Sequence, residues 1–269
     1  GFYYVDKDFR EHLTARKGRY IYAPVAAFTA SIAIWGLTLG TPYFWYAWQV
    51  YHFWLLWHYM RQNIGVTALA IQGSGGTRLG TADRLAITIV GVGAIVAASR
   101  LGPKGPLEYA DLVFNIGLAI YLAGVGLGIF QIIKRLGTGK DYVASAFIGA
   151  SLLFFLPTFY GQSYFAAIMG YAVAHALQYW LLMSLLAIGS GKKDGILRSV
   201  GAFIAMVLTI WTFIWLSRQG PMWGTWAAWV AGIGTGITVS HFIVDADSWR
   251  LREAFQRNFV MSRLGRYLS

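Results

Sequence analysis

Most of the chain consists of apolar runs that are long enough to cross a bilayer. About eight of them lie near residues 22–40, 43–71, 85–101, 111–133, 142–160, 162–189, 198–216 and 223–246. A bilayer core of roughly 30 Å is crossed by about 20 apolar residues in a helix. Backbone polar groups inside a membrane must be satisfied within the spanning segment, so these runs predict α-helices. The expected fold class is therefore an all-α integral membrane protein with about eight transmembrane helices.

The composition supports this prediction and excludes several classes of site. The chain is 57% hydrophobic and 12% charged, which is too apolar for a soluble domain of 269 residues. It contains no cysteine, so disulfides, thiolate-bound zinc, iron–sulfur clusters and thiol nucleophiles are excluded. The net charge of +11 comes from Lys and Arg in the connectors between the apolar runs. It therefore indicates membrane topology, and we expect no nucleic-acid partner.

The distribution of Lys and Arg predicts the orientation. With eight spans, 18 of the 22 Lys and Arg fall on one side and three on the other. By the positive-inside rule both termini are then cytoplasmic, in what we expect to be the bacterial inner membrane. Residues 1–21 are expected to form a cytoplasmic segment without a signal sequence, 22–249 the transmembrane domain, and 250–269 a basic cytoplasmic tail. The even-numbered spans carry the intramembrane His residues, so we expect them to form the inner bundle and the odd-numbered spans to face lipid.

Three groups of polar residues lie deep inside apolar runs, each at the spacing of one helical turn. They are His58 with Gln62, His175 with Gln178 and Tyr179, and His241 with Asp245. Residues three or four apart share one face of a helix. Intramembrane polar groups are costly and mark functional sites by default, although hydrogen bonds that hold two helices together are the structural alternative. We expect His58, His175, His241 and Asp245 to bind a metal, with the two Gln residues and Tyr179 supporting the ligands.

The second apolar run is unusually aromatic. Ten of the seventeen residues from Tyr43 to Tyr59 are Phe, Trp or Tyr. An aromatic belt explains the outer part of this run, whereas flat rings near mid-membrane suit a polyene, a quinone or a macrocycle. We expect His52, Trp54, Trp57 and Tyr179 to contact such a cofactor or ligand. His52 lies about 120° around the helix from His58, so both are not expected on one metal.

Other residues receive a structural interpretation. His12 is expected on the surface, and Asp247 and Arg250 are expected to form a solvated pair at the end of the last run. Gly124-x3-Gly128 and Gly232-x3-Gly236 are typical of close helix packing.

The assembled residues resemble two families. The segment with His241, Asp245 and Arg250 is similar to the final span of the Brp/Blh-type bacterial carotene dioxygenases, although the Pro-His-Gly and His-Phe-Gly motifs of that family are absent here. The resemblance implies a polytopic protein whose non-heme iron is held by intramembrane His. The layout of eight spans with His on even spans is also similar to heme A synthase, without its Glu-x2-His signature.

These patterns favour a membrane-embedded metal-dependent oxidoreductase or oxygenase, with iron as the expected cofactor. Its substrate is expected to be a hydrophobic conjugated or isoprenoid molecule, and a site with two or three His and an open position suits Fe(II) and dioxygen. The alternative is a non-catalytic subunit of a larger membrane complex, with heme or chlorophyll on axial His. Membrane lipids, and in the alternative other membrane subunits, are the expected partners. A transporter is less favoured because the spans lack paired Gly or Pro breaks.

Overall fold

The computed structural model is helical throughout the part of the chain that it describes. It describes residues 7–74, 76, 78–101, 109–139, 141–160, 164–189, separate positions between 196 and 212, 226–248, 250 and 253–268. Within these residues there are helices and connectors and no strand. The chain forms two compact units, one of residues 1–47 and 180–264 and the other of residues 48–179 and 265–269.

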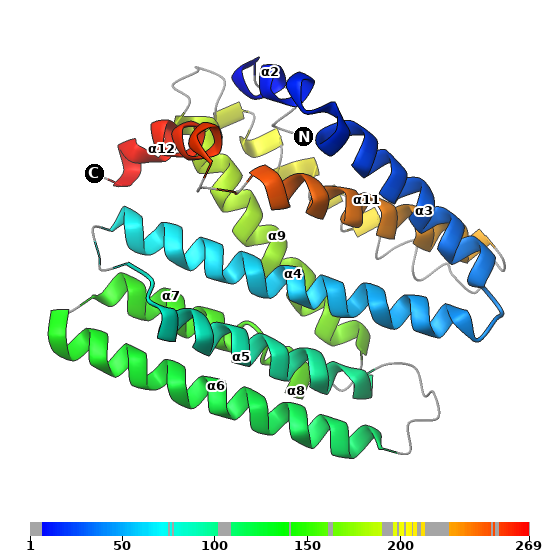
Figure 1. Cartoon of the computed structure of the whole chain (residues 1–269), viewed down its shortest axis with the longest axis horizontal. Helices are drawn as coiled ribbons and strands as arrows, with labels where there is room; N and C mark the ends of the chain where they lie inside the picture. Colours follow the sequence, from blue (N-terminus) through cyan, green and yellow to red (C-terminus); the bar gives the residue numbers. More distant parts are fainter. Residues whose placement is uncertain are drawn as a thin grey trace. The chain divides into compact units, whose positions relative to one another are not determined.

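The first unit is built on two long helices that run side by side, α3 (Ala23–Thr38) and α11 (Trp226–Ser248) (Figure 1). Glycines allow this close contact: a Cβ on Gly232 would lie 2.9 Å from the Cα of Ile32, and one on Gly236 2.8 Å from the ring of Phe28. The packing role predicted for Gly232-x3-Gly236 is therefore confirmed. After α3 the chain turns at Gly40, whose φ of 76° favours glycine.

Two shorter helices lie at one end of this unit. α2 (Lys7–Ala15) leads through a π-helical segment, Gly18–Tyr22, into α3, and α12 (Ala254–Leu268) follows α11. Phe9 of α2 packs against Phe255 and Phe259 of α12, with ring centres 5.7 and 5.2 Å apart. The two charged terminal segments are thus joined to each other by an aromatic cluster.

The second unit contains most of α4 (Tyr43–Gly73) and the first part of α9 (Tyr164–Gly189). Along the chain, α4 and α9 are separated by α5 (Thr81–Ala98), the 3-10 turn Ser99–Leu101, α6 (Ala110–Gly139), α7 (Tyr142–Leu153) and α8 (Pro157–Tyr160). Figure 1 labels these helices. α5 and α6 pack backbone to backbone. A Cβ on Gly93 would lie 2.5 Å from the backbone nitrogen of Tyr121, and one on Gly124 2.7 Å from that of Val90.

One arginine ties α5, α6 and α7 together. The guanidinium of Arg135 on α6 lies 2.5 Å from a carboxylate oxygen of Asp83 and 3.0 Å from one of Asp141. Both carboxylates also stabilise helix starts, since Asp83 accepts a hydrogen bond from the amide of Gly80 and Asp141 from that of Ala144. All three side chains are largely shielded from solvent, so this ionic contact fixes the ends of three helices.

Five helical stretches in the described residues are long and apolar enough to cross a membrane. They are Gly18–Thr38, Thr81–Ala98, Ala110–Gly139, Tyr142–Tyr160 and Ala167–Leu186. Large apolar side chains stand exposed on them, including Leu37, Phe130 and Leu153. Apolar outer surfaces of this kind fit a lipid environment. Long apolar helices of an integral membrane protein are therefore present. The expected spans 43–71 and 223–246 are helical but are not among these five stretches, and the expected span 198–216 lies partly outside the described residues.

The expected division into inner even spans and outer odd spans is wrong for the second unit. In α5, an odd-numbered span, 44% of an apolar 18-residue segment is buried. In α6, an even-numbered span, the buried share of such a segment is 22%. α5 is more buried because glycines and alanines let its neighbours approach closely, a property that the positions of His do not report.

Candidate functional site

Two of the predicted metal ligands come together in the second unit. His58 lies in the middle of α4 and His175 in the middle of α9, and their ring centres are 5.4 Å apart with an angle of 71° between the ring planes. His175 is buried and His58 is half-buried. Two imidazoles that lie deep inside separate apolar runs are therefore close together in the structure.

Aromatic rings surround this pair. The ring of Tyr59 lies 4.6 Å from that of His175 and within 6.3 Å of the rings of Phe154 and Tyr171. Tyr59 and Tyr171 are almost completely buried. Their phenol groups and flat rings give the His pair an aromatic wall with hydroxyl groups in it.

A chain of amide hydrogen bonds runs beside the histidines. The Asn63 side-chain nitrogen donates to the carbonyl of Tyr59 at 3.0 Å, and Asn63 Oδ1 accepts from the Gln178 side-chain nitrogen at 3.1 Å. The first bond fixes which end of the Asn63 amide is nitrogen, since a carbonyl can only accept. The second then fixes the Gln178 amide, whose Oε1 is buried and accepts no hydrogen bond from a described residue.

Asn63 is the residue that the sequence patterns missed. It lies next to Gln62, which helical spacing groups with His58, and an Asn in an apolar run itself indicates a functional or helix-packing position. Gln178 was expected to support His175 on its own helix, but its amide reaches across to α4. The role of Gln178 as a support for His175 stays a prediction, and its observed partner is Asn63 of α4.

Only some of the residues expected to contact a cofactor lie beside the two histidines. The ring of Tyr179 is stacked on that of His175 at 6.4 Å, as its spacing suggested. Trp54 and Trp57 are 41% and 46% exposed, so they stand on the outer surface of α4. The His52 Nδ1 lies 2.6 Å from the carbonyl oxygen of Trp48, which ties this imidazole to its own helix.

His241 and Asp245 form their own pair in the first unit. His241 Nε2 lies 3.1 Å from Asp245 Oδ2, one turn further along α11. Asp245 is buried and His241 half-buried. Within the described residues of the chain, no group of three or more His, Asp or Glu side chains is arranged to hold a metal ion. The ligands predicted from sequence therefore stand as two pairs, one in each unit.

No family model, curated protein or solved structure matches the chain. The site must therefore be interpreted from its own chemistry. Two imidazoles and an oriented amide oxygen supply uncharged nitrogen and oxygen ligand atoms in an apolar surrounding, whereas the Tyr171 hydroxyl already donates a hydrogen bond to the Phe155 carbonyl.

A second polar cluster lies at the end of α11 in the first unit, and it corrects two expectations. Asp247 is completely buried instead of solvated: its carboxylate accepts a hydrogen bond from the Tyr20 hydroxyl at 2.6 Å and lies 3.0 Å from Arg19. The pair with Arg250 exists at 3.6 Å. His12 is not an ordinary surface residue, because its ring is stacked 3.9 Å from that of Phe255. The return of the amino-terminal segment onto α11 and α12 buries Asp247 and leaves His12 half-buried.

Outside the apolar helices, this packing changes the pKa values of His12, Arg16 and Glu253. Burial lowers the pKa of His12 below its usual value of 6.5, and the positive charge of Arg16 lowers it further. A hydrogen bond from Arg16 lowers the pKa of Glu253. At neutral pH the His12 imidazole is therefore uncharged and the Glu253 carboxylate is ionised. The cluster then combines neutral aromatic contacts with ion pairs.

Proposed function

We propose that the protein is a membrane-embedded, metal-dependent oxidoreductase that acts on a hydrophobic conjugated or isoprenoid substrate. The observation that carries the proposal is the approach of His58 and His175 in the middle of two apolar helices. A functional site explains why imidazoles are retained there despite the cost of polar groups in hydrocarbon.

The ring separation favours a small ion over a macrocycle between the two imidazoles. With metal–nitrogen bonds of about 2 Å, two imidazoles on one tetrahedral ion have ring centres about 5 Å apart. On opposite faces of a porphyrin the two ring centres are roughly 6 Å apart and lie on one axis. The observed 5.4 Å with a 71° angle between the planes is closer to the first arrangement. This separation supports the proposal of a small metal ion.

Iron is the metal we propose, with His241 and Asp245 as the remaining protein ligands. Two or three His with one carboxylate and an open position is the donor set of non-heme Fe(II) sites that use dioxygen. His241 and Asp245 already face each other at 3.1 Å on one side of α11. The separation of the His58 and His241 imidazoles in an experimental structure of the purified protein tests this extension. Because metal–nitrogen bonds are about 2 Å, separations of the imidazoles above about 12 Å would exclude a shared mononuclear site.

The aromatic wall supports the proposed substrate class. Tyr59, Phe154 and Tyr171 present ring faces and edges within 6.3 Å of one another next to the His pair. Flat rings of this kind pack well against conjugated or branched hydrocarbon chains. An apolar substrate reaches such a site from the lipid phase, without passing through water.

The topology is part of the same proposal. We propose eight spans with both termini in the cytoplasm of a bacterial cell, which the 18-to-3 division of Lys and Arg supports. Reporter fusions at Ser74, Lys104, Gly139 and Lys192 should then report inside, outside, inside and inside. A periplasmic signal at Gly139 would contradict the eight-span arrangement.

Metal content tests the site itself. The purified protein should contain iron by elemental mass spectrometry and lack the strong visible bands of heme or chlorophyll. His175→Gln keeps a hydrogen-bonding group of similar length but removes a ligand, so we expect iron content to fall at least tenfold. His52→Gln is the matched control, because that imidazole is engaged with the Trp48 carbonyl and should not affect the metal. Full iron content in His175→Gln would contradict the proposal.

A further inference from the structure

One polar atom close to the pair of histidines lacks a hydrogen-bond donor among the residues that the structure describes. Gln178 Oε1 is buried and accepts no hydrogen bond from any of them. An amide oxygen can only accept hydrogen bonds. A buried acceptor without a donor is costly, and such atoms are rare in folded proteins. A donor from outside the chain, in a ligand or a water, is therefore the expected partner of this oxygen.

Neighbouring hydrogen bonds fix the orientation of this amide. The Tyr59 carbonyl can only accept, so the atom of Asn63 that lies 3.0 Å from it is the side-chain nitrogen. Asn63 Oδ1 then accepts from the Gln178 nitrogen at 3.1 Å. Rotating the Gln178 amide by half a turn would bring two oxygens together. Asn63, which is only 2% exposed, is thus a positioning residue for the Gln178 oxygen.

Gln178 lies where the buried side of α9 meets the exposed side. On an ideal helix it is about 60° from His175 and about 100° from Leu177. His175 is 9% exposed and Leu177 is 46% exposed, while Gln178 is half-buried. An apolar molecule that enters from the lipid can therefore contact Gln178 and the His175 imidazole together.

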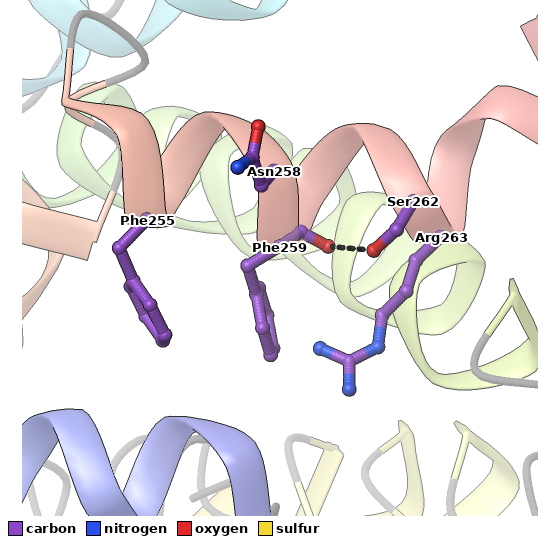
Figure 2. Close-up of a pocket in the computed structure, with 5 residues that line it drawn as sticks. All are labelled: Phe255, Asn258, Phe259, Ser262 and Arg263. Atoms are coloured by element: carbon purple, nitrogen blue, oxygen red, sulfur yellow. Dashed lines mark hydrogen bonds between the residues drawn. The ribbon is translucent and has the colours of Figure 1, made fainter.

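Two polar groups of a second candidate site, a hollow on α12, already have partners. The hollow measures about 300 Å³ and is lined by Phe255, Asn258, Phe259, Ser262 and Arg263 (Figure 2). The Ser262 hydroxyl donates to the Phe259 carbonyl at 3.2 Å, and the Arg263 guanidinium lies 3.7 Å from the centre of the Phe259 ring. Gln178 Oε1 is therefore the stronger indication of a ligand.

We propose that Gln178 Oε1 accepts a hydrogen bond from a hydroxyl group of the substrate, which makes the substrate a lipid-soluble alcohol or phenol. The inference rests on the proposed function, because that function places the hydrophobic part of the substrate against the aromatic wall. A pure hydrocarbon, an ether or a quinone has no donor for this oxygen. Bound in this way, the substrate holds its hydroxyl-bearing end within one helical turn of His175.

Competition binding to the full chain in detergent tests the preference for a hydroxyl group. The probes are tritiated geranylgeraniol and tritiated geranylgeranyl hydroquinone, each displaced by its unlabelled form or by its methyl ether. The ethers keep the hydrocarbon chain and remove the donors. The wild type should bind one hydroxyl compound about tenfold more tightly than its ether, since a ligand that leaves a buried polar group unpaired is disfavoured. The pair that shows this difference tells an alcohol from a phenol.

Two variants assign the preference to one atom. Gln178→Met keeps a side chain of similar length and removes the acceptor, so the preference for the hydroxyl compound should disappear. Gln49→Met is the matched control, because it is the same substitution about 20 Å from Asn63 along α4. It should keep the preference of the wild type.

The wild-type comparison is decisive whether or not the variants fold. Equal binding of hydroxyl compounds and ethers, which a bound water alone would give, would overturn the inference, as would binding of none of them. A preference that survives Gln178→Met, or that is lost equally in Gln49→Met, would also overturn it. Iron is measured on the same wild-type samples. Iron without the preference leaves the proposed metal site standing, whereas the preference without iron supports the role of Gln178 and contradicts the metal site.

Discussion

The two polar clusters of this protein stabilise buried polar groups in different ways. The cluster in the middle of α4 and α9 contains imidazoles, phenols and amides and no Asp, Glu, Lys or Arg among the residues that we have described in it. The cluster at the end of α11 is built on ionised groups, with a fully buried carboxylate among arginines. Both join segments that are far apart in the chain.

The difference follows from what surrounds each cluster. In the middle of an apolar helix a charge has neither water nor headgroups to stabilise it, so neutral hydrogen-bonding groups are tolerated best. At a helix end the arginines remain about two-fifths exposed while they reach the buried Asp247. The partial hydration of the arginines offsets part of the cost of burying their partner. We therefore expect the ionic cluster to contribute more to stability and the neutral cluster more to binding.

Asp247→Leu should give the largest loss of stability. The substitution removes the acceptor of the Tyr20 hydroxyl and the partner of Arg19. Hydrogen bonds to charged groups contribute about 1.5–3 kcal/mol each, and the exposed arginines can recover hydration, so we expect a loss of about 3 kcal/mol. Denaturation in mixed micelles measures the free energy of unfolding. A loss below about 1 kcal/mol would show that the ionic cluster is not the stronger of the two.

Asn63→Leu should have a smaller effect. It breaks the hydrogen bonds to the Tyr59 carbonyl and to Gln178. Interhelical hydrogen bonds in membranes contribute about 0.6 kcal/mol on average and at most about 1.7 kcal/mol, so we expect a loss of roughly 1 kcal/mol. A double-mutant cycle with Gln178→Leu isolates the pair, and a coupling free energy near zero would contradict the amide contact. A loss as large as that of Asp247→Leu would remove the contrast between the clusters.

Acidification should weaken the end cluster through His12. Its pKa is lowered in the folded state, mainly by burial, so the unfolded chain binds a proton more readily. Stability is therefore fully present above the usual pKa of 6.5 and should fall as the pH drops below it. Arg16, Asp247 and Glu253 also face this imidazole. His12→Phe keeps the stacking on Phe255 and should flatten the pH dependence below about 6.5. An unchanged profile would assign the titration to another group.

Glu253→Gln should have the smallest effect. The carboxylate and Arg16 form an ion pair at 3.0 Å that is open to solvent, whereas Arg16 keeps Asp247 at 3.7 Å. Exposed ion pairs are weakened by hydration and by salt. We expect a change far below that of Asp247→Leu, which disappears at about 1 M salt. A salt-independent loss of similar size would show that Glu253 acts as a buried group.

The candidate site was predictable in part. The positions of His58 and His175 in apolar runs, with a polar partner one turn away, predicted the pair that comes together. Asn63 was missed because helical spacing groups residues on one helix, whereas its partner Gln178 is 115 residues away. The burial of α5 was also missed, since glycine contacts between α5 and α6 decide it. His241 and Asp245 were correctly paired by their spacing.

The sequence by itself determined that this chain is helical and apolar, where its long helices lie, and which helices carry imidazoles. Those properties depend on hydropathy and on hydrogen bonds between residues a few positions apart, which a single run of sequence contains. Only the tertiary structure decided that Asp247 is buried under Tyr20, 227 residues away, and that Asn63 orients the amide of Gln178. Such contacts depend on which helix faces meet, and between α3 and α11 glycines that admit close backbone packing select those faces.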